Sequence, residues 1–309
     1  MPLKLDVLSI QQHVESISQN GFTIIPNQID QSWCDKLNVA ADLATIAVDR
    51  ALSSGIRLSH TLPSPYVCVA RRFYCWNQSV RDLLDHDTVH LLGSTVLGET
   101  RLWDMTLLEA RPLPERANLD GFDWHRDLQG YDWHRDFDVS DTQNGHSYLW
   151  IFFCLTDTTE ENGATWVVPG THRDGISVRH CVNQLSSNRP PATLQLRAKA
   201  GDLVAIDPTM IHSVGENRSR GNRRLLNVGL CRVGHDPLMN HWGVVPPKRR
   251  TQFSRRAQAL LQTKDWRLDI DWDVLPENWQ RPIDWDLRRA ALHLQRRARL
   301  AFKGLLGFV

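Results

Sequence analysis

Two histidine–aspartate pairs lie side by side near the middle of the chain. The nine-residue segment GFDWHRDLQ is followed at once by a near copy, GYDWHRDFD. Residues two apart on a strand point to the same side, so His134 and Asp136, or His125 and Asp127, can both reach one metal ion. A second histidine from a distant strand would complete two imidazoles and a carboxylate on one face of the ion, the pattern of non-haem Fe(II) oxygenases. Alone, the His-x-Asp triplet fits a salt bridge at a strand end equally well.

The candidate for the distant histidine is His212, which follows an apolar strand in GDLVAIDPTMIHSVGENRSRGNRR. Arg223 lies eleven positions further on, at the start of a predicted strand over 224–233. If that strand pairs antiparallel with the strand of His212, the Arg223 guanidinium reaches back toward the same site. A planar guanidinium there would bind a carboxylate through two hydrogen bonds.

Three further residues are weaker candidates. Ser213, next to His212, is placed to hydrogen-bond a carboxylate, although a plain backbone role fits equally well. Trp150 and Phe152 belong to the apolar run YLWIFFCLT, and one of them is placed to pack against a bound small molecule. Core packing is the simpler interpretation for both.

The elements that must position these residues change in character along the chain. Apolar spacing predicts helices over 8–20, 30–52 and 80–97, and GFTIIP reads as a strand between the first two. From about residue 100 short apolar strands with Gly, Pro and Asn turn signals take over. They are expected at 101–110, 148–156, 164–168, 203–206 and 224–233. This pattern favours a β-sandwich or barrel over βαβ units, and the simplest such fold is mainly β: a jelly roll with flanking helices.

Composition narrows the function classes. The 309 residues carry 36 basic and 35 acidic side chains, a formal net charge of +1, which gives no support to nucleic-acid binding. The six cysteines form no CxxC pair, which is typical of free thiols in a reducing compartment. We see neither a signal peptide nor an apolar run of the roughly 18 residues that a membrane span needs. These features predict a cytoplasmic protein.

The end of the chain has a different composition. We expect residues 1–245 to form the main domain and residues 246–309 to form a helical extension, rich in Trp and Arg, packed on it. Within the extension, 285–302 has an amphipathic helical pattern, with an apolar stripe made of Leu287, Ala291, Leu294 and Ala298. A helix packed on the core is the simplest interpretation; a contact that builds a homo-oligomer or a membrane-surface helix are the alternatives.

Four motifs together resemble the phytanoyl-CoA dioxygenase family: GFTIIPNQID, WHRD, ENGATWVVPGTHR and IHSVGENRSRGNRR. The resemblance covers most of residues 16–235. It implies a double-stranded β-helix and an enzyme that uses Fe(II), 2-oxoglutarate and O₂ on a small-molecule substrate. It further implies that His134, Asp136 and His212 hold the iron and that Arg223 holds the distal carboxylate of 2-oxoglutarate. Phe152 and Ser213 are then candidates for contacts to this cosubstrate.

The resemblance also favours the second His-x-Asp copy. The connection from the histidine to Asn162 is 28 residues long for His134 and 37 residues long for His125. The shorter connection resembles that of the family. The first copy would then lie on an access loop. The middle residue of the favoured triplet is Arg135, where the family often has Gln, so no role is carried over to it.

The predicted reaction is hydroxylation or oxidation of a C–H bond, with release of succinate and CO₂. Two other classes stay open: a Zn(II) or Mn(II) hydrolase or isomerase with the same three ligands, and a non-catalytic binding protein. Arg223 separates the first from the oxygenase, because only the oxygenase needs a cation poised for a dicarboxylate. The fold is shared across many substrates, so the sequence does not identify the substrate.

Overall fold

The computed structural model describes residues 7–54, 66–113, 133–139, 145–183, 193–235, 237–238, 240–262 and 279. The chain divides into two units, Met1–Val274 and Leu275–Val309, and all elements below belong to the first. The predicted helix at 285–302 and the first His-x-Asp copy, His125 and Asp127, lie outside the described residues.

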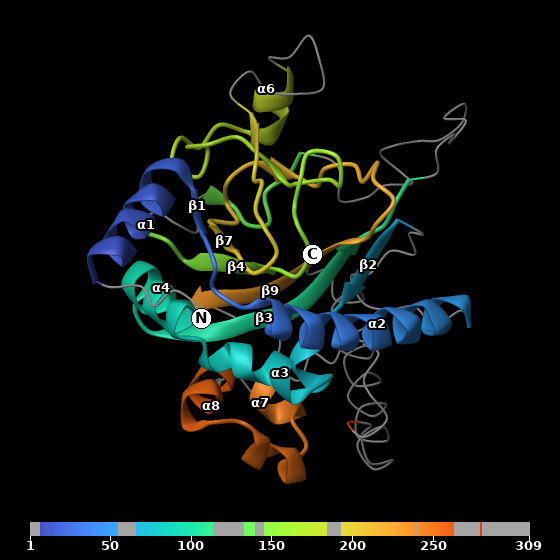
Figure 1. Ribbon diagram of the computed structural model, residues 1–309. Helices are drawn as coiled ribbons and strands as arrows, with labels where there is room; N and C mark the ends of the chain where they lie inside the picture. The colour runs from blue at the N-terminus through green and yellow to red at the C-terminus, as the bar shows by residue number, and fades with distance from the viewer. Residues whose placement is uncertain are drawn as a thin grey trace, which may run out of the picture. The chain divides into compact units, whose positions relative to one another are not determined.

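A six-stranded antiparallel sheet carries the fold, in the order β1-β7-β4-β9-β3-β2 (Figure 1). Its strands are β1 (Phe22–Ile25), β2 (Val67–Ala70), β3 (Thr100–Ala110), β4 (Tyr148–Cys154), β7 (Leu203–Ile206) and β9 (Arg223–Arg232). A second, smaller sheet has the order β6-β5-β8. It consists of β5 (Trp166–Val167), β6 (Leu194–Gln195) and β8 (His212–Ser213). Two antiparallel sheets with short strands are the predicted jelly roll.

Helices flank the two sheets. They are α1 (Val7–Asn20), α2 (Gln31–Ser53), α3 (Gln78–Arg81), α4 (Asp87–Leu97), α6 (Val178–Asn183), α7 (His241–Val244) and α8 (Arg255–Leu261). Short 3₁₀ turns are η1 (Phe73–Cys75), η2 (Asp82–Asp85) and η4 (Pro247–Gln252). In Figure 1, α2, α3 and α4 cover one face of the large sheet, and the smaller sheet lies on the other. None of the helices in the described ranges has both the length and the hydropathy to span a bilayer.

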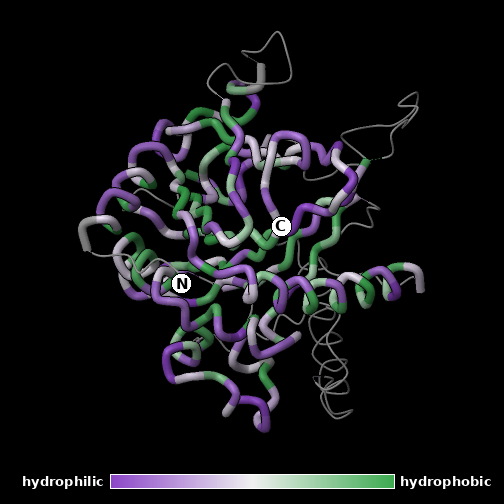
Figure 2. The backbone as a smooth tube through the Cα atoms, viewed as in Figure 1, coloured by the Kyte–Doolittle hydropathy of each residue, from purple (hydrophilic) through white to green (hydrophobic). Residues whose placement is uncertain are grey.

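Strand β4 shows why the sheet is covered on both faces. On one face, Ile151 lies opposite Val228 of β9 and is completely buried. On the other face, Trp150 lies opposite Gly229 and Phe152 opposite Asn227. A strand buried on both sides has apolar residues at nearly every position, which is why YLWIFFCLT has no polar alternation. Figure 2 shows the hydrophobic colour running along these central strands.

The core between the two sheets is apolar, with aromatic rings among aliphatic side chains. Its buried members include Tyr148, Trp150, Val167, Leu196 and Ile206. Phe22, Phe137 and Phe152 pack against them at its border. The predicted strands at 21–26, 101–110, 203–206 and 224–233 are confirmed to within one or two residues. These strands deliver the side chains that face the second sheet.

The helix predictions have mixed outcomes. The predicted helix over 30–52 is confirmed as α2, which begins after Asp30. The Asp30 carboxylate caps it by accepting a 2.9 Å hydrogen bond from the Trp33 N–H. A single helix over 80–97 is wrong. The chain leaves helical geometry at His86, whose backbone is extended (φ −62°, ψ 128°) and whose ring caps α4 at the Thr88 N–H.

Candidate metal centre

Residues 134 and 136 meet the segment 208–212 through backbone hydrogen bonds. His134 and His212 exchange both bonds of an antiparallel bridge, at 2.9 and 3.0 Å. This bridge extends the smaller sheet beyond its edge strand β8. Two residues on, the Asp136 N–H donates to the Pro208 carbonyl at 3.0 Å. Segments far apart in sequence are therefore locked together at the point where their side chains meet.

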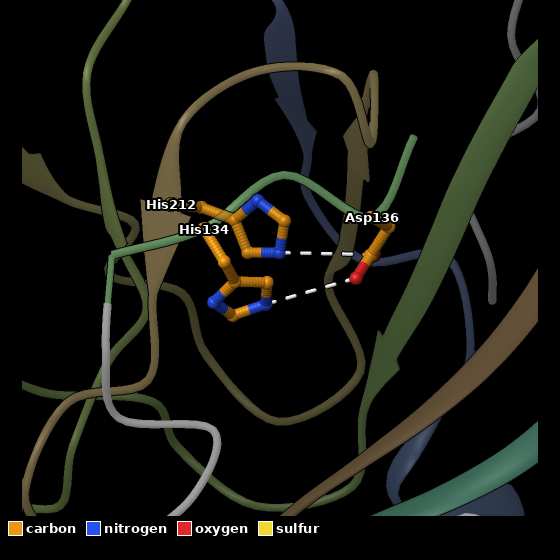
Figure 3. A group of neighbouring side chains, drawn as sticks. All are labelled: His134, Asp136 and His212. Carbon is orange, nitrogen blue, oxygen red and sulfur yellow. Dashed lines mark ion pairs between the residues drawn. The ribbon is translucent and has the colours of Figure 1, made fainter. Parts of the chain in front are cut away.

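The three polar side chains point toward one another (Figure 3). The Nε2 atom of His134 lies 3.6 Å from Oδ1 of Asp136, and Nε2 of His212 lies 3.7 Å from Oδ2. One ligand atom from each residue lies within 4.8 Å of the other two. Ligand bonds of about 2.1 Å place neighbouring ligand atoms roughly 3 Å apart, so only a small closure is needed to hold one ion. Two imidazoles and one carboxylate fit Fe(II) and leave positions for other ligands.

The hydrogen bonding of His212 prepares it as a metal ligand. Its Nδ1 lies 2.8 Å from the Met210 carbonyl oxygen. A carbonyl only accepts, so Nδ1 carries the proton and the Nε2 lone pair faces Asp136. Burial lowers the pKa of His212, against an opposing effect of the Asp136 carboxylate. The neutral imidazole, which is the form that binds metal, is therefore favoured.

The site is buried on the side of β8 and open on the other. The His212 side chain is 9 % exposed, whereas His134 and Asp136 are 36 % and 34 % exposed. Small molecules therefore reach the centre from the side of His134 and Asp136.

A small cavity lies between the two sheets. It is lined by Phe152, Cys154, Thr158, Thr165, Leu196, Val204, Ile206 and Leu225. Most of these side chains are apolar, and Thr158 and Thr165 add hydroxyl groups. Phe152, a sequence-predicted site residue, belongs to this wall.

Arg223 faces the same interior. It is 3 % exposed and lies two residues before Leu225 on β9, so both side chains point to one face of the strand. Burial raises the pKa of Cys154 to about 12, and the nearby Arg223 guanidinium opposes that rise. The structure thus places a buried cation beside a cavity wall.

Arg224 points the other way. Its guanidinium pairs with Glu109 at 2.7 Å and with Asp42 of α2 at 2.6 Å, on the helix-covered face. Alternation along β9 therefore assigns the two arginines different surroundings, and only Arg223 faces the space between the sheets.

The predicted route by which Arg223 reaches the site is wrong. β9 pairs with β3 and β4, and β8, which carries His212, pairs with β5. The two strands lie in different sheets, and Arg223 reaches the interior because those sheets face each other. Ser213 follows His212 on β8, so its side chain points to the opposite face; its hydroxyl donates to the Val214 carbonyl at 3.3 Å.

The sequence predicted that Trp150 packs in the core or against a bound small molecule. In the structure its indole Nε1–H donates to Oδ2 of Asp136 at 2.7 Å. A tryptophan on the strand after a His-x-Asp triplet is a weak signal, because the sequence does not say which way the ring turns.

Comparison with known proteins gives a family match. The family model described as phytanoyl-CoA dioxygenase (PhyH) matches residues 17–225. The dioxygenase olcK of Penicillium canescens is 26 % identical over 254 residues, which cover 81 % of this chain and 79 % of that protein. The dioxygenase sphC of Aspergillus fumigatus is 25 % identical over 180 residues, 58 % of this chain. The chain spans only 47 % of the length of sphC.

Solved structures share the fold. HygX from Streptomyces hygroscopicus, with nickel and 2-oxoglutarate bound, has a TM-score of 0.54 at 13 % identity, over 76 % of this chain and 90 % of HygX. AviO1 from Streptomyces viridochromogenes has a TM-score of 0.53 at 20 % identity, over 75 % of this chain and 99 % of AviO1. At these identities the likeness concerns the fold alone.

Proposed function

Because the chain belongs to the phytanoyl-CoA dioxygenase family, and with it to the Fe(II)- and 2-oxoglutarate-dependent dioxygenases, we propose that His134, Asp136 and His212 hold the iron. The observation that carries this proposal is the convergence of two imidazoles and one carboxylate within 4.8 Å. The protein would convert a C–H bond of a small organic molecule to C–OH, while 2-oxoglutarate and O₂ become succinate and CO₂. When bound, Fe(II) supplies the site at which O₂ is reduced.

Arg223 is the proposed partner of the distal carboxylate of 2-oxoglutarate. It is a buried cation on the cavity side of β9, and Arg224 faces the helix-covered side of the sheet. A guanidinium binds a carboxylate through two parallel hydrogen bonds, which fixes the orientation as well as the position of the ligand.

The side chains that line the cavity are proposed to shield the bound cosubstrate from water. Phe152, Leu225 and Val204 are apolar, so they exclude water from the methylene chain of a dicarboxylate. Exclusion of water also strengthens the attraction between Arg223 and the carboxylate, because the local dielectric falls. Ser213 stays a weaker candidate, since its side chain lies on the other face of β8.

The proposal leaves the substrate open within small organic molecules. We further propose that the protein is cytoplasmic and that it self-associates through residues 285–302. Both statements rest on the sequence patterns alone. The separation of residues 246–309 as an extension is proposed on the same basis. Residues 247–261, however, form η4 and α8 inside the first unit.

Succinate release tests the proposal without knowledge of the substrate, since these enzymes decarboxylate 2-oxoglutarate slowly on their own. With Fe(II), ascorbate, O₂ and 2-oxoglutarate, the unaltered protein should form succinate. His134→Ala and Asp136→Ala should reduce it to background, because each removes a metal ligand. His13→Ala, at a histidine bonded to Thr23 on α1 and β1, is the control and should keep full turnover.

Two results would reject the assignment. Full succinate formation by either ligand variant would show that iron is held elsewhere. Turnover of a substrate with Zn(II) or Mn(II) and no 2-oxoglutarate would favour a hydrolase or isomerase instead.

A further inference from the structure

The carboxylate of Asp136 receives a hydrogen bond from the opposite sheet. Trp150 of β4 donates its indole N–H to Oδ2 at 2.7 Å, at the short end of the range for N–H···O bonds. The bond is assisted by the carboxylate charge. It joins the large sheet to the segment that carries two of the three proposed ligands.

The indole itself is held on several sides. Trp150 is 4 % exposed. Its ring centroid lies 4.7 Å from that of Trp103 at 42°, and 5.6 Å from that of Phe137 at 65°. A tryptophan fixed by packing presents its single donor in one direction, with little side-chain entropy left to lose.

The cross-strand partner of Trp150 is a glycine, and the indole needs it. Gly229 lies opposite Trp150 in the β4–β9 pairing. A Cβ at position 229 would lie 2.8 Å from one carbon atom of the indole ring, closer than real Cβ contacts come, and 3.0 Å from another. The glycine therefore leaves the space in which the ring lies against β9 and extends its N–H toward Asp136.

Asp136 has few other restraints on its side chain. Its backbone N–H is bonded to Pro208, which fixes the main chain, but the carboxylate is 34 % exposed. The terminal torsion of aspartate is broad and two-fold, so an exposed carboxylate rotates easily. The indole bond holds Oδ2, while Oδ1 faces the His134 Nε2 at 3.6 Å.

We propose that Trp150 is a positioning residue that orients the metal-binding carboxylate of Asp136, and that Gly229 is present to make room for it. The inference rests on the proposed function, because it takes Asp136 as a metal ligand. Groups that hydrogen-bond to a metal ligand orient it, and their loss typically weakens metal affinity about 10–100-fold.

Metal affinity, rather than turnover, is the direct test. The metal-free protein is titrated with Co(II), a redox-stable substitute for Fe(II), and the visible absorption of the bound ion is followed. Trp150→Phe keeps an aromatic ring and removes the donor; it should raise the Co(II) dissociation constant at least tenfold and change the ligand-field spectrum. Trp33→Phe is the matched control, because it also removes an indole hydrogen bond, here to the Ser79 carbonyl at 2.9 Å, on α2. Its Co(II) affinity should be unchanged.

Gly229→Ala is the second variant. It leaves the tryptophan intact but pushes the ring away, so it should weaken Co(II) binding as Trp150→Phe does. Thermal unfolding of both variants without metal separates a loss of fold from a loss of site. If Trp150→Phe does not fold, the Gly229→Ala titration decides.

The outcomes separate the two proposals. If the unaltered protein does not bind Co(II), or if His134→Ala binds it equally well, the proposed metal site fails and this inference fails with it. If the unaltered protein binds Co(II), His134→Ala does not, and folded Trp150→Phe and Gly229→Ala bind within twofold of the unaltered protein, only the role of Trp150 is overturned.

Discussion

At the scale of single residues, side-chain chemistry and neighbours determine what each group of the site does. His212 is kept neutral by burial and fixed in one tautomer by the Met210 carbonyl. Asp136 is held through its backbone by Pro208 and through its side chain by Trp150. All three proposed ligands were named from the sequence. The His-x-Asp triplets and a distant His follow metal chemistry, and the family resemblance favoured His134 and Asp136 over His125 and Asp127. Their assignment stays a prediction until a metal is measured there.

Adjacent arginines on β9 provide a prediction at this scale. Arg223→Gln should raise KM for 2-oxoglutarate about 10–100-fold, since a charge-assisted hydrogen bond contributes about 1.5–3 kcal/mol. The turnover number should change less than KM. Arg224→Gln, one residue along and on the opposite face, should leave KM unchanged. Steady-state kinetics of succinate formation measure both.

Arg224 also stabilises the fold. Arg224→Gln takes one guanidinium partner from the buried Glu109 and breaks the pair with Asp42, so it should lower the free energy of unfolding by about 1–3 kcal/mol. An unchanged KM in Arg223→Gln would show that another cation binds the cosubstrate.

At the scale of elements, strand alternation decides which residues share a face, and sheet pairing decides which faces meet. The sequence predicted β9 well, because its apolar run has turn signals before it. It did not predict that β9 and β8 lie in different sheets, since pairing partners depend on contacts between residues distant in sequence. The helix break at His86 also escaped prediction, because the apolar spacing over 80–97 continues through it.

A buried ion pair lies at the edge of the sheet formed by β2 and β3, and it should make the stability of the fold depend on pH. Asp104 of β3 is 0 % exposed; it accepts hydrogen bonds from Arg71 and Thr106 at 2.9 and 2.8 Å. Burial alone would raise the pKa of Asp104, but Arg71, His241 and these hydrogen bonds outweigh it and hold the pKa below its ordinary value. The ionised carboxylate is therefore the form that stabilises the fold.

The contribution of Asp104 to stability should fall at low pH. A depressed carboxyl pKa contributes stability above the unfolded value of about 3.9, and this contribution is lost as the pH falls through the folded-state pKa. Asp104→Asn should lower the free energy of unfolding at pH 7 by about 3 kcal/mol, because Arg71 loses a buried partner. The difference from the unaltered protein should shrink below about pH 4. Urea unfolding across pH 3–7 measures it.

Asp157→Asn is the solvent-exposed control for Asp104→Asn. Asp157 pairs with Lys199 at 3.1 Å, but its side chain is 49 % exposed, so the same substitution should cost under about 1 kcal/mol. A pH-independent difference for Asp104→Asn would mean that packing, and not charge, accounts for its effect.

At the scale of the whole molecule, the first unit includes more of the C-terminal sequence than the expected boundary at 245 suggests. Helix α8 contacts β3 and η2. Phe253, Leu260 and Leu261 are at most 4 % exposed.

Truncation tests this boundary. Deletion of 246–309 removes the three buried side chains, whose burial contributes roughly 5 kcal/mol or more, against a typical total stability of about 5–15 kcal/mol. Deletion of 275–309 removes the second unit alone and retains all three. The longer deletion should lower Tm by far more, or prevent folding, in a thermal scan. Equal Tm values for both truncated proteins would support the boundary at 245.

By itself the sequence predicted a mainly β jelly roll, because periodicity and turn residues are local properties of the chain. Its motifs carried the resemblance to the family, and that resemblance implied the reaction class. It also supplied the residues of the candidate site and the arginine beside the cavity. The tertiary structure decided how they meet: the His134–His212 bridge, the separation of β8 and β9 into facing sheets, the opposite surroundings of Arg223 and Arg224, and the turn of the Trp150 ring over Gly229 toward Asp136. Each of these depends on packing between segments distant in sequence, which fixes a direction in space that no local pattern encodes.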